Sequence, residues 1–116
     1  TNTRKGTVED GSGRASEEMT VLPEQSWGPL GYQPATGTLN LRVGRAGKAW
    51  VRNLPAPVTL DDEAGDAAGP YWPLTVAGID AHVRTSQAQT VVEVVAPVRF
   101  SDQGVGNGDD LVLRPR

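Results

Sequence analysis

Cysteine is absent from this sequence, and so are long hydrophobic runs. Without cysteine the chain can form neither disulfide bonds nor thiolate metal sites, which fits a reducing cytoplasm. No run of about 18 apolar residues occurs, so the sequence predicts no membrane-spanning helix. We therefore expect a cytoplasmic protein that has no membrane partner.

The charge balance and the low histidine content exclude further classes of function. The chain has 11 basic and 14 acidic residues, for a net charge of -3, so it lacks the basic surplus of a nucleic-acid-binding protein. His82 is the only histidine, and neither a zinc site nor a Ser-His-Asp triad is expected around it. We interpret His82 as a surface or strand residue.

Glycine and proline are frequent instead, at 14 and 9 of the 116 residues. They leave little room for long helices, and the apolar residues are mostly valine and leucine in short runs. This composition predicts a mainly β protein, either a small turn-rich barrel or a sandwich. A chain of this length forms one domain, residues 1–116, of which residues 1–6 are expected to be flexible.

Short alternating or apolar runs mark the expected strands. Residues 39–43 alternate strictly between apolar and polar side chains and give the clearest strand pattern. The other expected strands are residues 71–76, 79–83, 91–95 and 111–113. Ala77-Gly78 is the expected turn of a hairpin, and Asn107-Gly108 predicts a second tight turn.

The connections contain turns and one short helix. Residues 44–48 are expected to form a turn, with residues 49–51 as the hairpin partner strand. Residues 61–69 are acidic and small and are expected to be a surface loop. Ser16 can cap a helix that Pro23 either limits to about two turns or restarts at its own first position.

Residues 11–16, G-S-G-R-A-S, form a candidate phosphate-binding loop. Glycines allow backbone N–H groups to approach an anion, and the dipole of a helix starting just after would add to the attraction. The spacing matches neither G-x-G-x-x-G nor a Walker loop. From these residues alone, an ordinary turn is the simpler interpretation.

Thr38 and Asn40 form a candidate magnesium site. They lie two positions apart on an expected strand, so their side chains point to one face. Hydroxyl and amide oxygens are hard ligands that suit Mg²⁺. Taken alone, two such residues are more often solvent-facing.

Glu93 interrupts the apolar run at residues 91–95. A carboxylate in that place either lies on a solvated face or is held there as a base. Trp27, Trp50 and Trp72 can stack on a flavin or a base, but core packing is the preferred interpretation.

The order and spacing of these segments resemble a known family. Residues 30–40 read L-G-Y-Q-P-A-T-G-T-L-N and look like the L-G-F-x-P-Y-x-G-T-L-N segment of the archaeal CTP-dependent riboflavin kinases. Arg84-Thr85 followed by residues 91–97, V-V-E-V-V-A-P, is similar to that family's R-T … I-I-E-I-I-A-P. Residues 106–113 look like its closing L-K-D-G-D-x-V-x-I, and residues 11–14 fall where the family carries G-x-G-x-G-R-Y-F.

The resemblance implies a compact six-stranded cradle-loop barrel, mainly β, with one or two short helices. It implies an enzyme that moves the γ-phosphate of CTP to the 5′-hydroxyl of riboflavin with Mg²⁺, giving FMN and CDP. By the same resemblance, Thr38 and Asn40 bind Mg²⁺, Thr85 and Glu93 contact the flavin, and the nucleotide is contacted by Gly11, Ser12, Gly13, Arg14, Ala15, Val98, Arg99, Phe100 and Ser101. Glu93 is then the candidate catalytic residue, which orients or deprotonates the riboflavin hydroxyl.

Two other hypotheses stay open. Ala15-Ser16 replaces the family's aromatic pair, and Glu9-Asp10 stands where the family usually has another glycine. A flavin- or nucleotide-binding module of the same fold without phosphoryl transfer is therefore an alternative. A DNA-binding cradle-loop regulator is disfavoured by the acidic balance. We expect small-molecule substrates, no nucleic-acid partner and a monomer.

Overall fold

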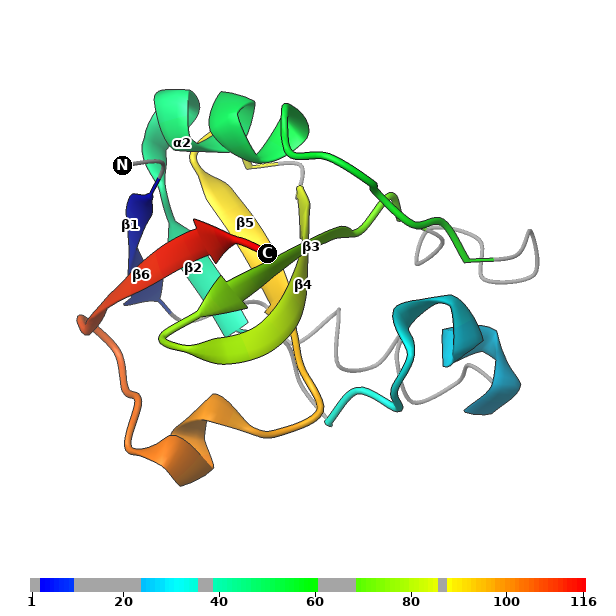
Figure 1. The fold of residues 1–116 in the computed structure, drawn as a ribbon. Coiled ribbons are helices and arrows are strands. Elements are labelled where there is room, and N and C mark those ends of the chain that lie inside the picture. Colours follow the sequence, from blue (N-terminus) through cyan, green and yellow to red (C-terminus); the bar gives the residue numbers. More distant parts are fainter. Residues whose placement is uncertain (1–2, 10–23, 36–38, 61–68, 86–87) are drawn as a thin grey trace.

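The computed structural model describes residues 3–9, 24–35, 39–60, 69–85 and 88–116. Six antiparallel strands close into a barrel in the order β1-β2-β5-β4-β3-β6 (Figure 1). They are Arg4–Glu9 (β1), Leu39–Arg42 (β2), Trp72–Val76 (β3), Ile79–Thr85 (β4), Val91–Val95 (β5) and Asp110–Pro115 (β6). The prediction of a mainly β, six-stranded barrel is confirmed.

Short helical segments accompany the barrel. They are the α-helix Gly44–Arg52 (α2) and the 3-10 helices Glu24–Leu30 (η1) and Phe100–Gln103 (η3). Figure 1 shows α2 lying across one end of the barrel, with η3, in orange, near the opposite end. In the part of the chain that the structure describes, no helix has the length and apolar character needed to cross a membrane. The helix expected after Ser16 lies outside the described residues.

Alternation along the strands separates the barrel interior from its outer face. Leu41 on β2 pairs with Val8 on β1 and with Val92 on β5, and all three side chains are buried in the core. One position earlier, Asn40 pairs with Glu93, and these side chains point outward. Because the barrel is closed, each strand is paired on both sides.

The predicted β3–β4 hairpin is confirmed. Val76 pairs with Ile79, and the turn residues Ala77 and Gly78 have φ angles of 51° and 78°. Both values are positive, as a two-residue type I′ turn requires. The expected strands at β2, β5 and β6 are also confirmed.

The turn before β6 is confirmed as well. Gly108 has a φ of 86°, which favours glycine at this position. Its N–H donates to the carbonyl oxygen of Val8 at 2.9 Å, an ordinary length for a backbone hydrogen bond. This contact ties the Asn107-Gly108 turn to the end of β1.

Helix α2 replaces the turn and strand expected at residues 44–51, and that expectation was wrong. Its buried residues, Gly47, Lys48 and Val51, recur at helical spacing on one side. The Nζ atom of Lys48 donates to the carbonyl oxygen of Ala88 at 2.9 Å, which fastens α2 to the connection between β4 and β5. Three residues, A-W-V, are too few to distinguish a period of 2 from one of 3.6.

Strand β1 was not among the strands expected from the sequence. Residues 1–6 were expected to be flexible, but Arg4, Lys5 and Gly6 belong to β1 and pair with β6. Only Gly6 and Val8 are buried in β1, so the strand shows no clear apolar alternation in its sequence. A Cβ atom at Gly6 would lie 3.0 Å from the Cβ of Leu41, so the missing side chain permits the close approach of β1 to β2.

Replacing Gly47 with alanine should destabilise the barrel, although alanine is the better helix former by about 1 kcal/mol. The new Cβ would lie 2.7 Å from the Cβ of Val43, so α2 would have to shift. We expect a net loss of about 1–3 kcal/mol in the free energy of unfolding, measured with urea.

The matched control is Ala49→Gly, at an exposed position of α2. It should lose only the intrinsic helix propensity, about 1 kcal/mol. A Gly47→Ala protein that is more stable than the wild type would contradict the packing described for α2.

Candidate functional site

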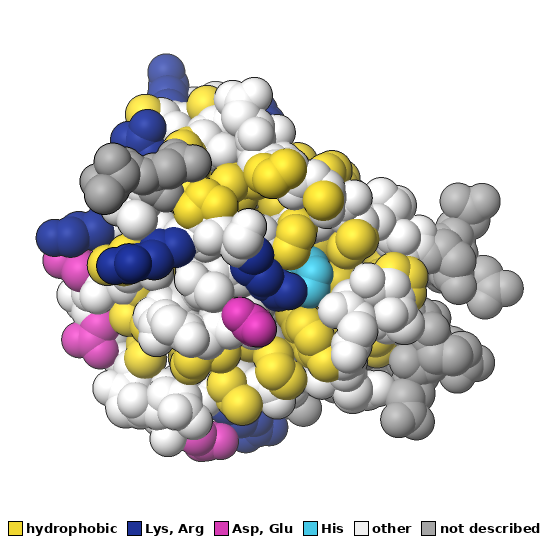
Figure 2. All heavy atoms as spheres, viewed as in Figure 1, with side chains coloured by type: hydrophobic (Ala, Val, Ile, Leu, Met, Phe, Trp, Pro, Cys, Tyr) yellow, Lys and Arg dark blue, Asp and Glu magenta, His cyan; other side chains and the backbone are white. Residues whose placement is uncertain are grey.

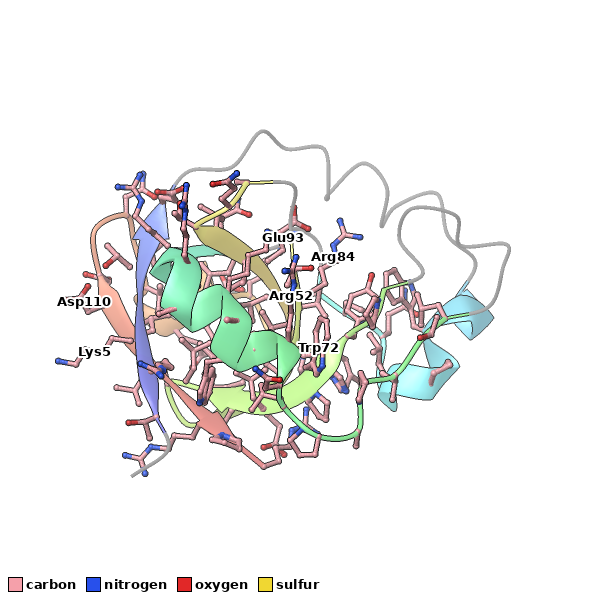
Figure 3. The ribbon with its side chains drawn as sticks, turned by 90° about the horizontal axis from the view of Figure 1, so that it is seen from above. Lys5, Arg52, Trp72, Arg84, Glu93 and Asp110 are labelled. Carbon is pink, nitrogen blue, oxygen red and sulfur yellow. The ribbon has the colours of Figure 1, made fainter. Side chains whose placement is uncertain are left out.

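Three polar side chains form a row across neighbouring strands on the outer face of the barrel. Asn40 on β2 pairs with Glu93 on β5, and Glu93 pairs with Arg84 on β4. Paired residues project to the same side of a sheet, so the three side chains are neighbours. Figure 3 shows the labelled Glu93 and Arg84 close together. Asn40, Glu93 and Arg84 are called the polar row below.

An ion pair joins two members of the polar row. The Nε atom of Arg84 donates to Oε2 of Glu93 at 2.6 Å, and the two side chains are 13% and 18% exposed. A charge-assisted hydrogen bond with this little water around it is stronger than an exposed one. Glu93 therefore faces outward but is largely withdrawn from solvent, so it does not lie on an ordinary solvated face.

Asn40 is half-buried between two strands that each bring a carboxylate. Glu9 on β1 pairs with it from the other side, and the Glu9 carboxylate is bound to Arg42 at 2.7 Å. The amide oxygen of Asn40 fits Mg²⁺, which prefers hard oxygen ligands and keeps several of its waters. The described residues contain no group of three His, Cys, Asp or Glu that could hold a metal, and Thr38 lies outside them.

Thr85 lies on the other side of the sheet from Glu93. It pairs with Val92, whose side chain is buried in the core, whereas Glu93 projects outward. The structure therefore places the two expected flavin-contacting residues at the end of β4 and in the middle of β5, on opposite faces of the sheet. Their contacts with a flavin stay a prediction.

The segment that leads to Asn40 is anchored on the end of β5. The hydroxyl of Tyr32 donates to the carbonyl oxygen of Val95 at 3.1 Å and lies 2.8 Å from Nδ1 of His82. The N–H of Ala35 donates to the carbonyl oxygen of Ala96 at 2.8 Å. These contacts hold residues 31–35 beside the residues that follow β5.

The expected nucleotide-binding residues after β5 differ in exposure. Val98, Arg99 and Ser101 are exposed, whereas the ring of Phe100 is only 5% exposed and packs in the core. Phe100 can therefore meet a nucleotide only through its backbone. The expected glycine loop, Gly11 to Ala15, lies outside the described residues.

His82 is a strand residue, as expected, but it is not on the surface, and that alternative was wrong. Its side chain is 3% exposed, and Figure 2 shows the histidine among hydrophobic side chains with a basic side chain beside it. Burial and the nearby Arg116 guanidinium lower the pKa of His82 to about 4. Burial also raises the pKa of the Tyr32 hydroxyl. At neutral pH both partners of this hydrogen bond are therefore uncharged.

Two features of this region were not predicted from the sequence. Arg84 was noted in the sequence only as part of the Arg84-Thr85 motif, and no role was predicted for it. Tyr32 occupies the position where the resembling motif has phenylalanine, and this extra hydroxyl, together with a single histidine, was the available signal for the Tyr32–His82 pair.

The three tryptophans pack in hydrophobic clusters, which is the interpretation preferred from the sequence. Trp72 is buried in the main core, and Trp50 packs against that core while partly buried. Trp27 belongs to a second cluster, where its ring meets Tyr71 edge-on with centroids 6.4 Å apart. The core-packing interpretation is confirmed.

The fold and the polar row define a small antiparallel barrel that holds an ion pair and a neighbouring oxygen ligand on its outer face. No model of a known protein family matches the sequence. A riboflavin kinase from Aeropyrum pernix is 30% identical to this chain over an alignment of 125 residues. The alignment covers 95% of this chain and 92% of that protein. The chain therefore belongs to the riboflavin kinase family. The resemblance is confirmed at this level, and CTP as the donor stays a prediction.

Stability should decrease as the pH falls from about 6.5 to about 4. The pKa of His82 is about 4 in the folded protein against an ordinary value of 6.5, so in this range the unfolded chain binds more protons. The single group contributes at most about 1.4 kcal/mol per pH unit and about 3 kcal/mol in total. Urea unfolding at several pH values in this range measures the effect.

The His82→Gln variant is the comparison, because glutamine keeps hydrogen-bonding capacity and does not titrate. The carboxylates contribute to both proteins, so the difference between the two pH profiles isolates His82. Equal slopes for the wild type and the variant would contradict a buried neutral histidine.

Proposed function

We propose that the protein is a CTP-dependent riboflavin kinase that transfers the γ-phosphate of CTP to the 5′-hydroxyl of riboflavin and releases FMN and CDP. The observation that carries the proposal is the strand register that sets Asn40 opposite Glu93. It brings an oxygen ligand suited to Mg²⁺ next to a carboxylate suited to a hydroxyl group. Phosphoryl transfer needs mainly positioning and charge neutralisation, and these two groups serve both needs.

Each member of the site has a proposed task. Glu93 accepts a hydrogen bond from the riboflavin hydroxyl and takes its proton as the new P–O bond forms. Thr38 and Asn40 would hold Mg²⁺, which supplies positive charge to the transferred phosphoryl group. Thr85 contacts the flavin from the end of β4.

The nucleotide is assigned to Gly11–Ala15 and to the segment after β5. Val98, Arg99 and Ser101 offer exposed side chains there, Arg99 offers a cation, and Phe100 offers its backbone. CTP is proposed as the donor because residues 30–40 and 91–97 resemble the CTP-dependent family. We propose that the enzyme acts in the cytoplasm as a monomer, on small molecules rather than nucleic acid.

The test is to incubate the protein with riboflavin, Mg²⁺ and each of CTP, ATP, GTP and UTP and to measure FMN by chromatography. We expect FMN with CTP and much less with the other three nucleotides. Tight flavin or CDP binding without product would favour a binding module, which the changed residues Ala15-Ser16 suggest. Salt-sensitive DNA binding with neither result would favour a regulator.

Glu93→Gln should lower kcat by at least about tenfold, because the amide cannot accept the proton. The Mg²⁺ concentration for half-maximal activity should stay unchanged. Asp110→Asn is the control, since Asp110 is an exposed carboxylate on β6. An unchanged rate in Glu93→Gln would refute the assigned role.

Asn40→Ala should raise the Mg²⁺ concentration for half-maximal activity by about tenfold or more, since it removes one oxygen ligand. Asn40→Asp keeps an oxygen at the same place and should recover most of the metal response. A metal dependence that is the same in all three proteins would show that Asn40 does not bind Mg²⁺.

A further inference from the structure

The proposed reaction leaves one charged residue of the polar row without a task. The Arg84 side chain is 13% exposed, although it lies on the outer face of the barrel. Taking a guanidinium this far from water is costly unless it is well paired. The 2.6 Å bond from its Nε atom to Glu93 Oε2 is therefore the first interaction to examine.

A second arginine–glutamate pair on the same face shows what is particular about Arg84. Arg42 and Glu9 also form an ion pair, at 2.7 Å, but their side chains are 66% and 30% exposed. Such a pair is weakened by water and by the freedom of two long side chains. Of the two pairs, Arg84–Glu93 is the one with the geometry and burial to hold a carboxylate in place.

The hydrogen bond also determines which carboxylate oxygen of Glu93 is bound to Arg84. It is made through Nε, which lies closer to the backbone than the terminal nitrogens, so strand β4 sets the place of Oε2. A glutamate has three side-chain torsions, and an unrestrained one samples several of their wells. Reacting groups displaced by about 1 Å can lose about a hundredfold in rate.

We propose that Arg84 is a positioning residue for phosphoryl transfer, which holds Glu93 through Oε2 so that Oε1 meets the riboflavin hydroxyl. This inference rests on the proposed function and adds a residue to it. Arg84 acts through Glu93 and does not itself meet the nucleotide. Its removal should therefore lower kcat and leave the KM for the nucleotide nearly unchanged.

The test is a double-mutant cycle with Arg84→Gln, Glu93→Gln and the combined variant. We expect Arg84→Gln to lower kcat by about ten- to a hundredfold. The combined variant should be no slower than Glu93→Gln alone, because both changes remove the same function. Arg114→Gln, at an exposed arginine on β6, is the control for loss of one positive charge.

A conservative variant separates positioning from folding. Arg84→Lys keeps a positive charge next to Glu93 but lacks the planar guanidinium, so it should fold and recover part of kcat. Thermal unfolding of every variant records any loss of stability separately from kcat. If Arg84→Gln does not fold, the same cycle is run with Arg84→Lys.

The outcomes distinguish the inference from the proposed function. Losses that multiply in the combined variant, or a raised nucleotide KM with unchanged kcat, would overturn the positioning role while the kinase activity stands. A wild-type chain that makes no FMN with any nucleotide would overturn the proposed function and this inference together. Non-additive losses in kcat with an unchanged KM for the nucleotide support the positioning role of Arg84.

Discussion

The antiparallel register between β2 and β5 is the constraint on which both the core and the site depend. It sets Leu41 opposite Val92 inside the barrel and Asn40 opposite Glu93 outside it. A slip of one residue would turn the leucines of β2 toward water and its polar residues toward the core. The hydrophobic core that stabilises the barrel therefore also fixes the spacing of the polar row.

An element of the fold could be predicted from the sequence only where its buried face shows a clear pattern of apolar side chains. Strands β3 to β6 have apolar runs next to turn residues, and these two signals were sufficient to predict the strands. Strand β1 buries only the side chain of Val8, because its other buried position is Gly6. Helix α2 has two glycines and a charged buried residue, Lys48, so its buried side does not look apolar in the sequence.

Two members of the polar row, Asn40 and Glu93, were predicted as single residues, but their arrangement was not predicted. Ligand chemistry and a charge inside an apolar run were weak signals for Asn40 and Glu93 when taken alone, and the family resemblance made both of them site candidates. Their adjacency needs the pairing of β2 with β5, which are about fifty residues apart in the chain, and a strand pattern does not name its partner. The ion pair with Arg84 needs a further pairing and a rotamer, so only three-dimensional structure reveals it.

The end of β5 joins the two sides of the proposed reaction. The carbonyl oxygens of Val95 and Ala96 accept hydrogen bonds from Tyr32 and Ala35, which precede the proposed metal-binding segment. The residues after Ala96 lead into the proposed nucleotide segment, and Glu93 lies three positions before Ala96. A buried tyrosine hydroxyl needs a partner, and the neutral His82 supplies one where a phenylalanine would need none. In this chain the geometry between the proposed metal, flavin and nucleotide sites therefore rests on one strand end, held by hydrogen bonds as well as by apolar packing.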